Sequence, residues 1–335
     1  MTGCYARGVP LSFLALIAQV ACHGASPSDT ATATDADADT DTDTDTDTAP
    51  PDPATVPLAG SCPADQLFGA FGVESDGLLT VASGAVADGV VPLTVLEEVS
   101  AEGDCRLLRR VSLFCDPACS PDQTCGFDGE CIPYPAAQDL GIVTVEGLFD
   151  PVEMTASSPG FTYYQLGLPS PAYDPGALIT LQTEGGALPP FTLYGVGIVP
   201  LEIVAEEWVL SEVADLEVHW ASPGGPVRSR LHVRITIDQH GASPIQLDCD
   251  FPDTGTGTLP SALMAEFVAS GVTGFPAALV TRQTVDSTVI GDGCVEFAIA
   301  WSGAGEIRVE GYTPCTQQAD CPTGQICNTD LEICE

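Results

Sequence analysis

Few residues of this 335-residue chain have the types and spacing that binding or catalysis requires. Asp248, Asp250 and Asp253 lie close together, and carboxylate oxygens are ligands that Ca²⁺ prefers. His219 and His232 would face each other, and could hold a metal ion, if the segments that carry them formed a hairpin. Outward-facing histidines on paired strands are more often solvated. We therefore predict no metal or cofactor site, with weak Ca²⁺ binding by the aspartates as the alternative.

The sequence Asp253-Thr254-Gly255 also bears on catalysis. It resembles the DTG motif of aspartic proteases, in which two such aspartates share a proton. Only one copy occurs outside the Asp/Thr-rich segment, so a single-chain enzyme of that class would lack its second aspartate. Asp-Thr-Gly is also an ordinary turn sequence, and we favour that interpretation. A hydrolase with Asp253 as its first candidate residue remains the alternative function.

Other catalytic signatures are missing from the sequence. HExxH, GxSxG, a P-loop and a dinucleotide fingerprint are all absent. The chain contains no lysine, which excludes Schiff-base catalysis. We predict that the protein is not an enzyme and has a binding, adhesion or structural role at the cell surface, with a glycan or an envelope protein as its ligand.

Aromatic side chains are the residues that could stack on a sugar. Trp220 and Trp301 are in phase with apolar core positions, so their burial is expected. Trp208 and the pair Tyr163-Tyr164 are free of that constraint and can contribute to a binding surface.

The charge of the chain limits its partners. The formal net charge is -38, with nine arginines against 47 acidic residues. The body without the Asp-rich segment is also strongly acidic. Such a field opposes the phosphate backbone, so nucleic acid is excluded as a partner.

Fourteen cysteines point to disulfides made in an oxidising compartment. Four lie in residues 115–131 and four in residues 315–334, and each module is too short for a hydrophobic core. The stretch CPTGQIC in the second module resembles the short Dickkopf-like cysteine-rich modules of exported bacterial proteins. That resemblance covers the last twenty or so residues and implies a scaffold, with no activity attached.

The sequence alone does not determine which cysteines pair. For both modules we predict first-to-third and second-to-fourth pairing, with two further bridges elsewhere. The predicted pairs are Cys115–Cys125, Cys119–Cys131, Cys315–Cys327, Cys321–Cys334, Cys62–Cys105 and Cys249–Cys294. A zinc site in the first module is disfavoured, because the second pair of cysteines is too widely spaced and no histidine lies nearby.

The N-terminus predicts export. Arg7 precedes an apolar stretch at residues 9–21, which is too short to span a bilayer and fits a signal peptide at residues 1–21. The sequence LIAQVACHG resembles the lipobox of bacterial lipoproteins, with Ala21 before Cys22 and Gln19 at a position that usually holds Leu, Val or Ile. The resemblance implies acylation of Cys22, anchorage in a lipid bilayer and, through His23, the outer membrane. An ordinary cleaved signal is the alternative.

A spacer of residues 22–60 follows the anchor. Aspartate occupies every second position from Asp35 to Asp47, and such a segment has no apolar side chain to bury. We predict a disordered linker that serves as a tether.

The remaining residues predict a mainly β protein. Short apolar runs punctuated by Asp-Gly pairs predict a small β domain at residues 61–114, ahead of the cysteine-rich module at 115–135. Residues 139–313 show about ten runs of alternating apolar residues, which predict an antiparallel β-sandwich before the C-terminal module at 314–335. Residues 216–220 and 230–238 are predicted to pair as a hairpin, and residues 260–270 to form a helix.

Overall fold

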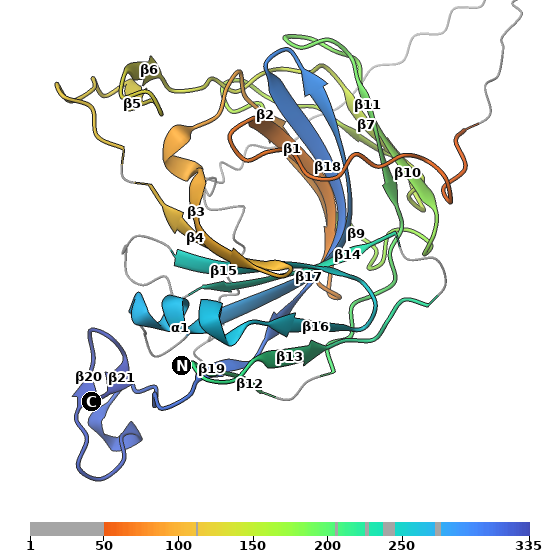
Figure 1. Cartoon of the computed structure of the whole chain (residues 1–335). Coiled ribbons are helices and arrows are strands. Elements are labelled where there is room, and N and C mark those ends of the chain that lie inside the picture. Colours follow the sequence, from red (N-terminus) through yellow and green to blue (C-terminus); the bar gives the residue numbers. More distant parts are fainter. Residues whose placement is uncertain (1–49, 112, 205–206, 225–227, 237–244, 272–275) are drawn as a thin grey trace, which may run out of the picture. The chain divides into compact units, whose positions relative to one another are not determined.

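The computed structural model describes residues 50–111, 113–204, 207–224, 228–236, 245–271 and 276–335 (Figure 1). The predicted signal peptide, Cys22 and the Asp-rich part of the spacer lie outside these residues. The described chain is mainly β, as predicted, and contains a single α-helix within the described residues.

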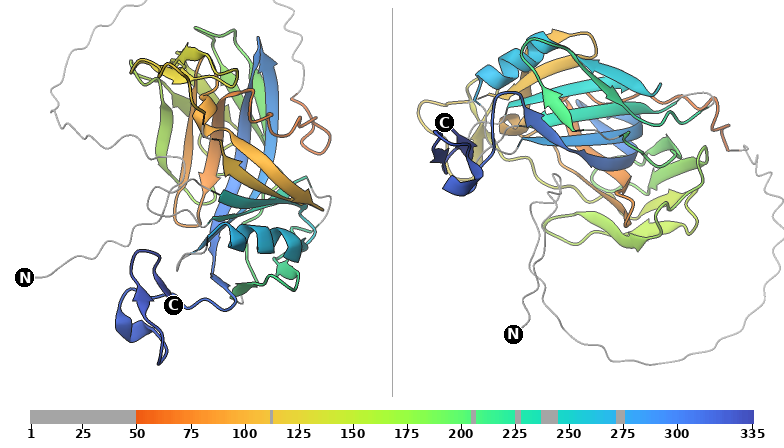
Figure 2. Two further views of the ribbon diagram at one scale, coloured as in Figure 1. Left: turned by 60° about the vertical axis from the view of Figure 1, so that its left-hand side comes forward. Right: turned by 90° about the horizontal axis from the view of Figure 1, so that it is seen from below.

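A nine-stranded sheet organises the body. Its strands are strongly twisted and curved, as Figures 1 and 2 show from different sides. Neighbouring strands are antiparallel except β1 and β18, which are parallel. In spatial order the strands are β3 (Leu96–Glu102), β4 (Cys105–Arg110), β15 (Ile245–Pro252), β14 (Arg230–Thr236), β17 (Ala277–Ile290), β18 (Gly293–Gly305), β1 (Leu67–Ser75), β2 (Thr80–Val86) and β9 (Tyr163–Leu168).

Smaller elements complete the fold. A four-stranded sheet has the order β11 (Thr192–Val196), β10 (Leu178–Thr183), β7 (Val143–Glu146) and β8 (Val152–Met154). Two strand pairs, β12 (Trp208–Leu210) with β19 (Ile307–Val309) and β13 (Leu216–His219) with β16 (Thr256–Leu259), accompany helix α1 (Ser261–Ala269). The cysteine-rich modules contain β5 (Gln123–Cys125), β6 (Cys131–Pro133), β20 (Cys327–Asn328) and β21 (Ile333–Cys334), and the short 3-10 helices are η1 (Pro92–Thr94) and η2 (Gln318–Asp320).

Both hydrophobic cores lie on one face of the nine-stranded sheet, which we call the outer face. Residues paired across neighbouring strands share a face, so Val233 of β14 lies on the same side as Val280 of β17. Because side chains alternate between the two faces along β17, Asp286 lies on the same side as Val280, and it pairs with Phe297 of β18. Val233 and Val280 belong to the first core and Phe297 to the second. The two cores therefore stand side by side on the same face.

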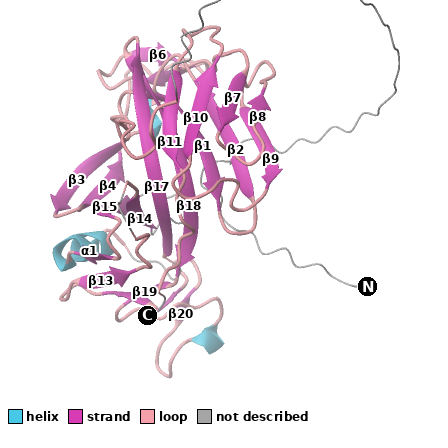
Figure 3. Ribbon diagram, turned by 90° about the vertical axis from the view of Figure 1, so that its right-hand side faces the viewer, coloured by secondary structure: helices cyan, strands magenta, loops and turns pink. Residues whose placement is uncertain are grey.

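Different elements cover the two cores. The first core packs beneath α1 and the pairs β13–β16 and β12–β19, through residues such as Phe267 and Leu210. The second packs beneath the four-stranded sheet, through residues such as Ile179 and Leu193. Figures 1 and 3 show these covers beside different parts of the large sheet. The part of the large sheet that lies beneath the four-stranded sheet therefore has the two-layer packing of a β-sandwich.

The predicted division between residues 61–114 and 139–313 is wrong. Residues 50–335 form one compact unit, and strands from both segments share the large sheet. β1 pairs with β18, and β4 pairs with β15. The predicted hairpin of residues 216–220 with 230–238 is also wrong, because β13 pairs with β16 while β14 pairs with β15 and β17. Alternation located these strands, but it carries no information about their partners.

The helix was predicted correctly. α1 spans Ser261–Ala269 after Pro260, within one residue of the predicted boundaries. Leu263 and Phe267, one turn apart, are buried in the first core. Gly271 follows the helix with a φ of +119°, a conformation that favours glycine and ends the helical path.

The disulfides confirm the predictions made within the modules and correct the other two. Cys115–Cys125, Cys119–Cys131, Cys315–Cys327 and Cys321–Cys334 are bonded as predicted. The predicted Cys62–Cys105 and Cys249–Cys294 are wrong, since the bonds are Cys62–Cys294 and Cys105–Cys249. Cys105 and Cys249 face each other in the register of β4 and β15, which strand alternation cannot reveal.

Loop length predicts unequal contributions of these bonds to stability. Cys105 and Cys249 are 144 residues apart, whereas Cys321 and Cys334 are 13 apart. The loop-entropy relation gives the longer closure about 2 kcal/mol more stabilisation. We expect the Cys105→Ala/Cys249→Ala chain to lose at least about that much more free energy of unfolding than the Cys321→Ala/Cys334→Ala chain. Guanidinium unfolding followed by tryptophan fluorescence measures both, and equal losses would contradict the expectation.

Candidate functional site

The three aspartates considered as Ca²⁺ ligands are not brought together. Asp248 lies within 3.5 Å of His232 and 3.2 Å of Arg234, whereas Asp250 pairs with Arg230 at 2.6 Å. Asp253 lies beyond the end of β15 and joins the packing on the outer face. Each carboxylate thus has its own partners, and the arrangement does not form a Ca²⁺ cage.

Asp253 is fully buried, and both oxygens of its carboxylate accept hydrogen bonds. Its Oδ1 accepts hydrogen bonds from Trp220 Nε1 at 2.7 Å and Arg282 Nη2 at 3.1 Å. Its Oδ2 accepts from Ser229 Oγ at 2.6 Å and Arg282 Nε at 2.7 Å. Both oxygens therefore have two donors, and the side chain is held as a structural carboxylate.

Arg282, which sequence reasoning missed, is the partner of that carboxylate and is itself fully buried. Its remaining donors reach backbone carbonyls, with Nη1 at 2.9 Å from Pro200 O and Nη2 bonded to Ala221 O. In the β-sheet register Arg282 lies between Leu231 of the first core and Trp301 of the second. The ion pair therefore sits at the junction between the two cores.

The junction continues along β17 with polar side chains that serve the backbone. Thr284 Oγ1 donates to Val196 O at 3.0 Å and accepts from Val196 N at 3.2 Å. Asp286 accepts from Tyr194 N and from Ala59 N, each at 2.9 Å. These side chains bind β11 and the segment before β1 to the outer face, so their polarity is structural.

The histidines and aromatics fall in separate places. His219 is on β13 and His232 on β14, which are not paired, so the two do not form the metal site considered from the sequence. Trp220 and Trp301 are buried, as predicted. Trp208 is also buried, at 6% exposure, and is not free to bind sugar.

Strand alternation separates the two adjacent tyrosines of β9. Tyr163 is buried, and its hydroxyl donates to Asp139 Oδ1 at 3.2 Å and accepts from Leu140 N at 2.7 Å. Tyr164 pairs with Ser83 on the other face and is 61% exposed. Only Tyr164 of the predicted pair is therefore available at the surface.

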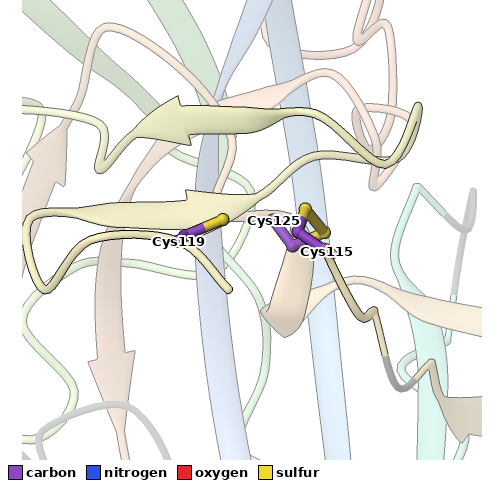
Figure 4. A group of neighbouring side chains, drawn as sticks. All are labelled: Cys115, Cys119 and Cys125. Carbon is purple, nitrogen blue, oxygen red and sulfur yellow. A yellow bond between two sulfur atoms is a disulfide. The ribbon is translucent and has the colours of Figure 1, made fainter. Parts of the chain in front are cut away.

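Cysteines are the only side chains that gather as three metal-type ligands within the described ranges. They are Cys115, Cys119 and Cys125 in one module and Cys315, Cys321 and Cys327 in the other. Figure 4 shows the first group, in which Cys115 and Cys125 are joined by a disulfide. Because all these sulfurs are committed to disulfide bonds, neither group is a metal site.

A small surface depression lies near the start of β7. It is lined by Asp139, Gly141, Ile142, Thr155, Ala156 and Glu184. Its two carboxylates already accept backbone hydrogen bonds, Asp139 from Gly141 N at 3.0 Å and Glu184 from Ile142 N at 3.2 Å. These contacts shape the loop and leave the depression without a distinctive binding group.

The opposite side of the nine-stranded sheet, which we call the inner face, has a different character. Both cores take only outer-face side chains from these nine strands within the described residues. The strand register arranges the inner-face side chains in rows. One row runs Arg106, Asp248, Arg234, Leu279, Ala304; the next runs Asp250, His232, Thr281, Ser302; and a third runs Arg230, Gln283, Ala300, Glu74, Val81.

The middle of the inner face combines hydroxyl, amide and small side chains. Thr281 and Ser302 on neighbouring strands are hydrogen-bonded through their hydroxyls at 3.0 Å. Farther along, the register places Ala298, Gly72 and Ser83 in one row that ends at Tyr164. Thr281 is buried, and Val285 lies beside Ala298, so this part of the face combines small, apolar and polar side chains.

Carboxyl groups at the two ends of the inner face have opposite pKa shifts. Burial opposes ionisation of Asp248, but the hydrogen bond and charge of His232 and the charge of Arg234 outweigh it and lower the pKa of Asp248. Part of the Glu74 side chain reaches solvent, yet desolvation of its carboxyl by the surrounding protein raises the pKa of Glu74. Burial likewise raises the pKa of Glu296, against the opposing hydrogen bond from Cys62 N. The inner face thus has a cation-rich end and an end with carboxyls that lack cationic partners within the described residues.

Comparison with known proteins adds no family assignment. A search of protein-family models and a search of curated proteins both found no match. Among the residues described, no helix has the length and apolar character to cross a bilayer. The six disulfides indicate an exported or extracellular protein.

The buried ion pair gives a direct stability prediction. Asp253→Asn leaves the Arg282 guanidinium buried without its countercharge, so we expect a loss of about 3–5 kcal/mol in the free energy of unfolding. Asp250→Asn is the matched control, because it removes the same charge from the half-exposed Arg230 pair. We expect that control to lose less than about 1 kcal/mol. Guanidinium unfolding at pH 7 compares them, and similar losses would argue against the assigned role of Asp253.

Proposed function

We propose that the chain is an exported, lipid-anchored protein that binds a glycan of the cell envelope or cell surface on its inner face. The observation that supports this is the division of labour between the two faces of the large sheet. The outer face supplies both hydrophobic cores, whereas the inner face carries charged and polar side chains interspersed with apolar ones such as Leu279 and Val285. Within the described residues these inner-face side chains are members of neither core.

The side chains of the inner face favour a glycan over a protein ligand. Protein interfaces depend largely on aromatic and apolar anchors that become fully buried. The inner face instead offers the hydroxyl of Ser302, the amide of Gln283 and the ring of Tyr164, with the buried Thr281 hydrogen-bonded to Ser302. Sugar hydroxyls match such donors and acceptors, and an aromatic ring can pack against the apolar side of a sugar.

The proposed lipid anchor is based on the N-terminal leader sequence, which ends at Cys22. Acylation of Cys22 leaves twelve cysteines in the mature chain beyond it, and all twelve are bonded in the six disulfides. The segment between Cys22 and residue 50 then connects the lipid to the body. The even number supports a dedicated role for Cys22 outside disulfide bonding.

No observation favours the alternative of a hydrolase that uses Asp253. Its carboxylate is fully buried and accepts four hydrogen bonds, two of them from a cation. An aspartic-type hydrolase needs a carboxyl that reaches a water molecule and shares a proton with a second carboxyl.

Filling the inner face should abolish glycan binding. Ala298 is one of the small side chains of the inner face, and Ala298→Trp would place a large ring above its neighbours on that face. Ala262→Trp, on the exposed side of α1, is the control. On a glycan array and on isolated envelope polysaccharide, we expect binding by the wild type and the control but not by Ala298→Trp. Equal binding by all three, or no binding by the wild type, would refute the proposal, with thermal unfolding checking each fold.

The lipid anchor has its own test. In a Gram-negative host supplied with radiolabelled palmitate, we expect label on the wild-type chain and none on Cys22→Ser. The variant should also leave the membrane fraction, because a single lipidated cysteine would be its attachment point. Unchanged incorporation of label would rule out acylation at Cys22.

A further inference from the structure

The scarce positive charges of the body are concentrated on the inner face. Residues 50–335 contain eight arginines in a strongly acidic sequence. Four of them lie on the inner face near one end of the sheet, on β4 and on β14, which β15 separates: Arg106, Arg110, Arg230 and Arg234. This end of the inner face, with four arginines against Asp248, Asp250 and Glu98, is therefore less negative than the body as a whole.

Two of these four arginines are available to a ligand. Arg230 pairs with Asp250, and Arg234 pairs with Asp248. Arg106 and Arg110 are exposed and make no ion pair with any described residue.

The neighbours of Arg106 and Arg110 leave their charges largely uncompensated. Asp248, across the strand from Arg106, is already bound by Arg234 and His232. Arg110 lies opposite Leu96 of β3. Glu98, opposite the intervening Leu108, is the remaining acid on this part of the face.

Spacing along β4 suits a chain of regularly placed anionic groups. Arg106 and Arg110 are four residues apart on one strand, which separates them by about 13 Å. Arginine presents a planar fork of donors that matches a carboxylate. The hydroxyl and amide rows of the inner face continue from this end, so a polymer can contact the arginines and those rows together.

We propose that the ligand is a polysaccharide that carries carboxylate groups, bound through Arg106 and Arg110. This inference rests on the proposed function and specifies its ligand. A polymer with about one carboxylate per sugar suits the site better than a densely sulfated one, because the acidic outer surface repels high charge density.

Affinity electrophoresis and titration test the assignment with four polymers. We expect wild-type protein to bind polygalacturonate, and to bind dextran, dextran sulfate and poly-glutamate at least tenfold more weakly. Arg106→Gln/Arg110→Gln should weaken polygalacturonate binding by about a hundredfold, since each charged contact contributes about tenfold. Binding should also weaken as NaCl increases.

Arg109→Gln is the matched control. Arg109 is an exposed arginine on the same strand, but it lies on the outer face. We expect the affinity of this variant for polygalacturonate to stay within about twofold of wild type, which is well below the roughly tenfold effect of one charged contact. Equal losses in control and double variant, or poly-glutamate binding as strong as polygalacturonate, would overturn the inference. Preferential binding of dextran would overturn it while leaving glycan binding intact, whereas absence of all glycan binding would overturn the proposed function as well.

Discussion

The buried pair of Arg282 and Asp253 is the interaction on which the architecture depends. Burial of each ion in isolation is unfavourable by several kcal/mol, so both must be fully hydrogen-bonded. Here Asp253 receives two donors on each oxygen, and Arg282 also reaches the carbonyls of Pro200 and Ala221. An apolar residue in place of Arg282 would leave those carbonyls without this donor. The ion pair therefore holds the backbone at Pro200, in the segment that leads from β11 of one cover to β12 of the other.

That junction explains how one long sheet supports two cores on a single face. In the row of Arg282, Leu231 belongs to one core and Trp301 to the other. Beyond it, Thr284 and Asp286 bond to backbone groups of the neighbouring cover and of the segment before β1. The covers thus meet over polar side chains whose hydrogen bonds are satisfied. Because both cores lie on the outer face, the charged and polar side chains of the inner face belong to neither of them.

Local features of the sequence predicted local features of the structure. The helix, the mainly β composition, and all four bonds within the modules were correct because neighbouring residues determine them. The two long-range disulfides and the separate domain at residues 61–114 were wrong, since both depend on which distant strands pair.

The candidate site was hard to foresee for a related reason. In β17 the outward positions are Arg282, Thr284 and Asp286, so the usual alternation of apolar and polar residues disappears. Asp253 drew attention through a motif, although burial and its partners make it structural. The inner-face arginines come from strands distant in the sequence, and only the register of β4, β15 and β14 places them together.

Disulfides add stability to a sheet whose two hydrophobic cores both lie on its outer face. Such a sheet removes less apolar surface from water than one packed on both faces, so less hydrophobic stabilisation is available to it. Cys105–Cys249 links β4 to β15 across the first core, and Cys62–Cys294 ties the segment before β1 to β18. Both close loops of more than a hundred residues, for which the entropic stabilisation is greatest. Oxidative folding outside the cytoplasm is therefore the condition under which these two bonds supplement the packing of the outer face.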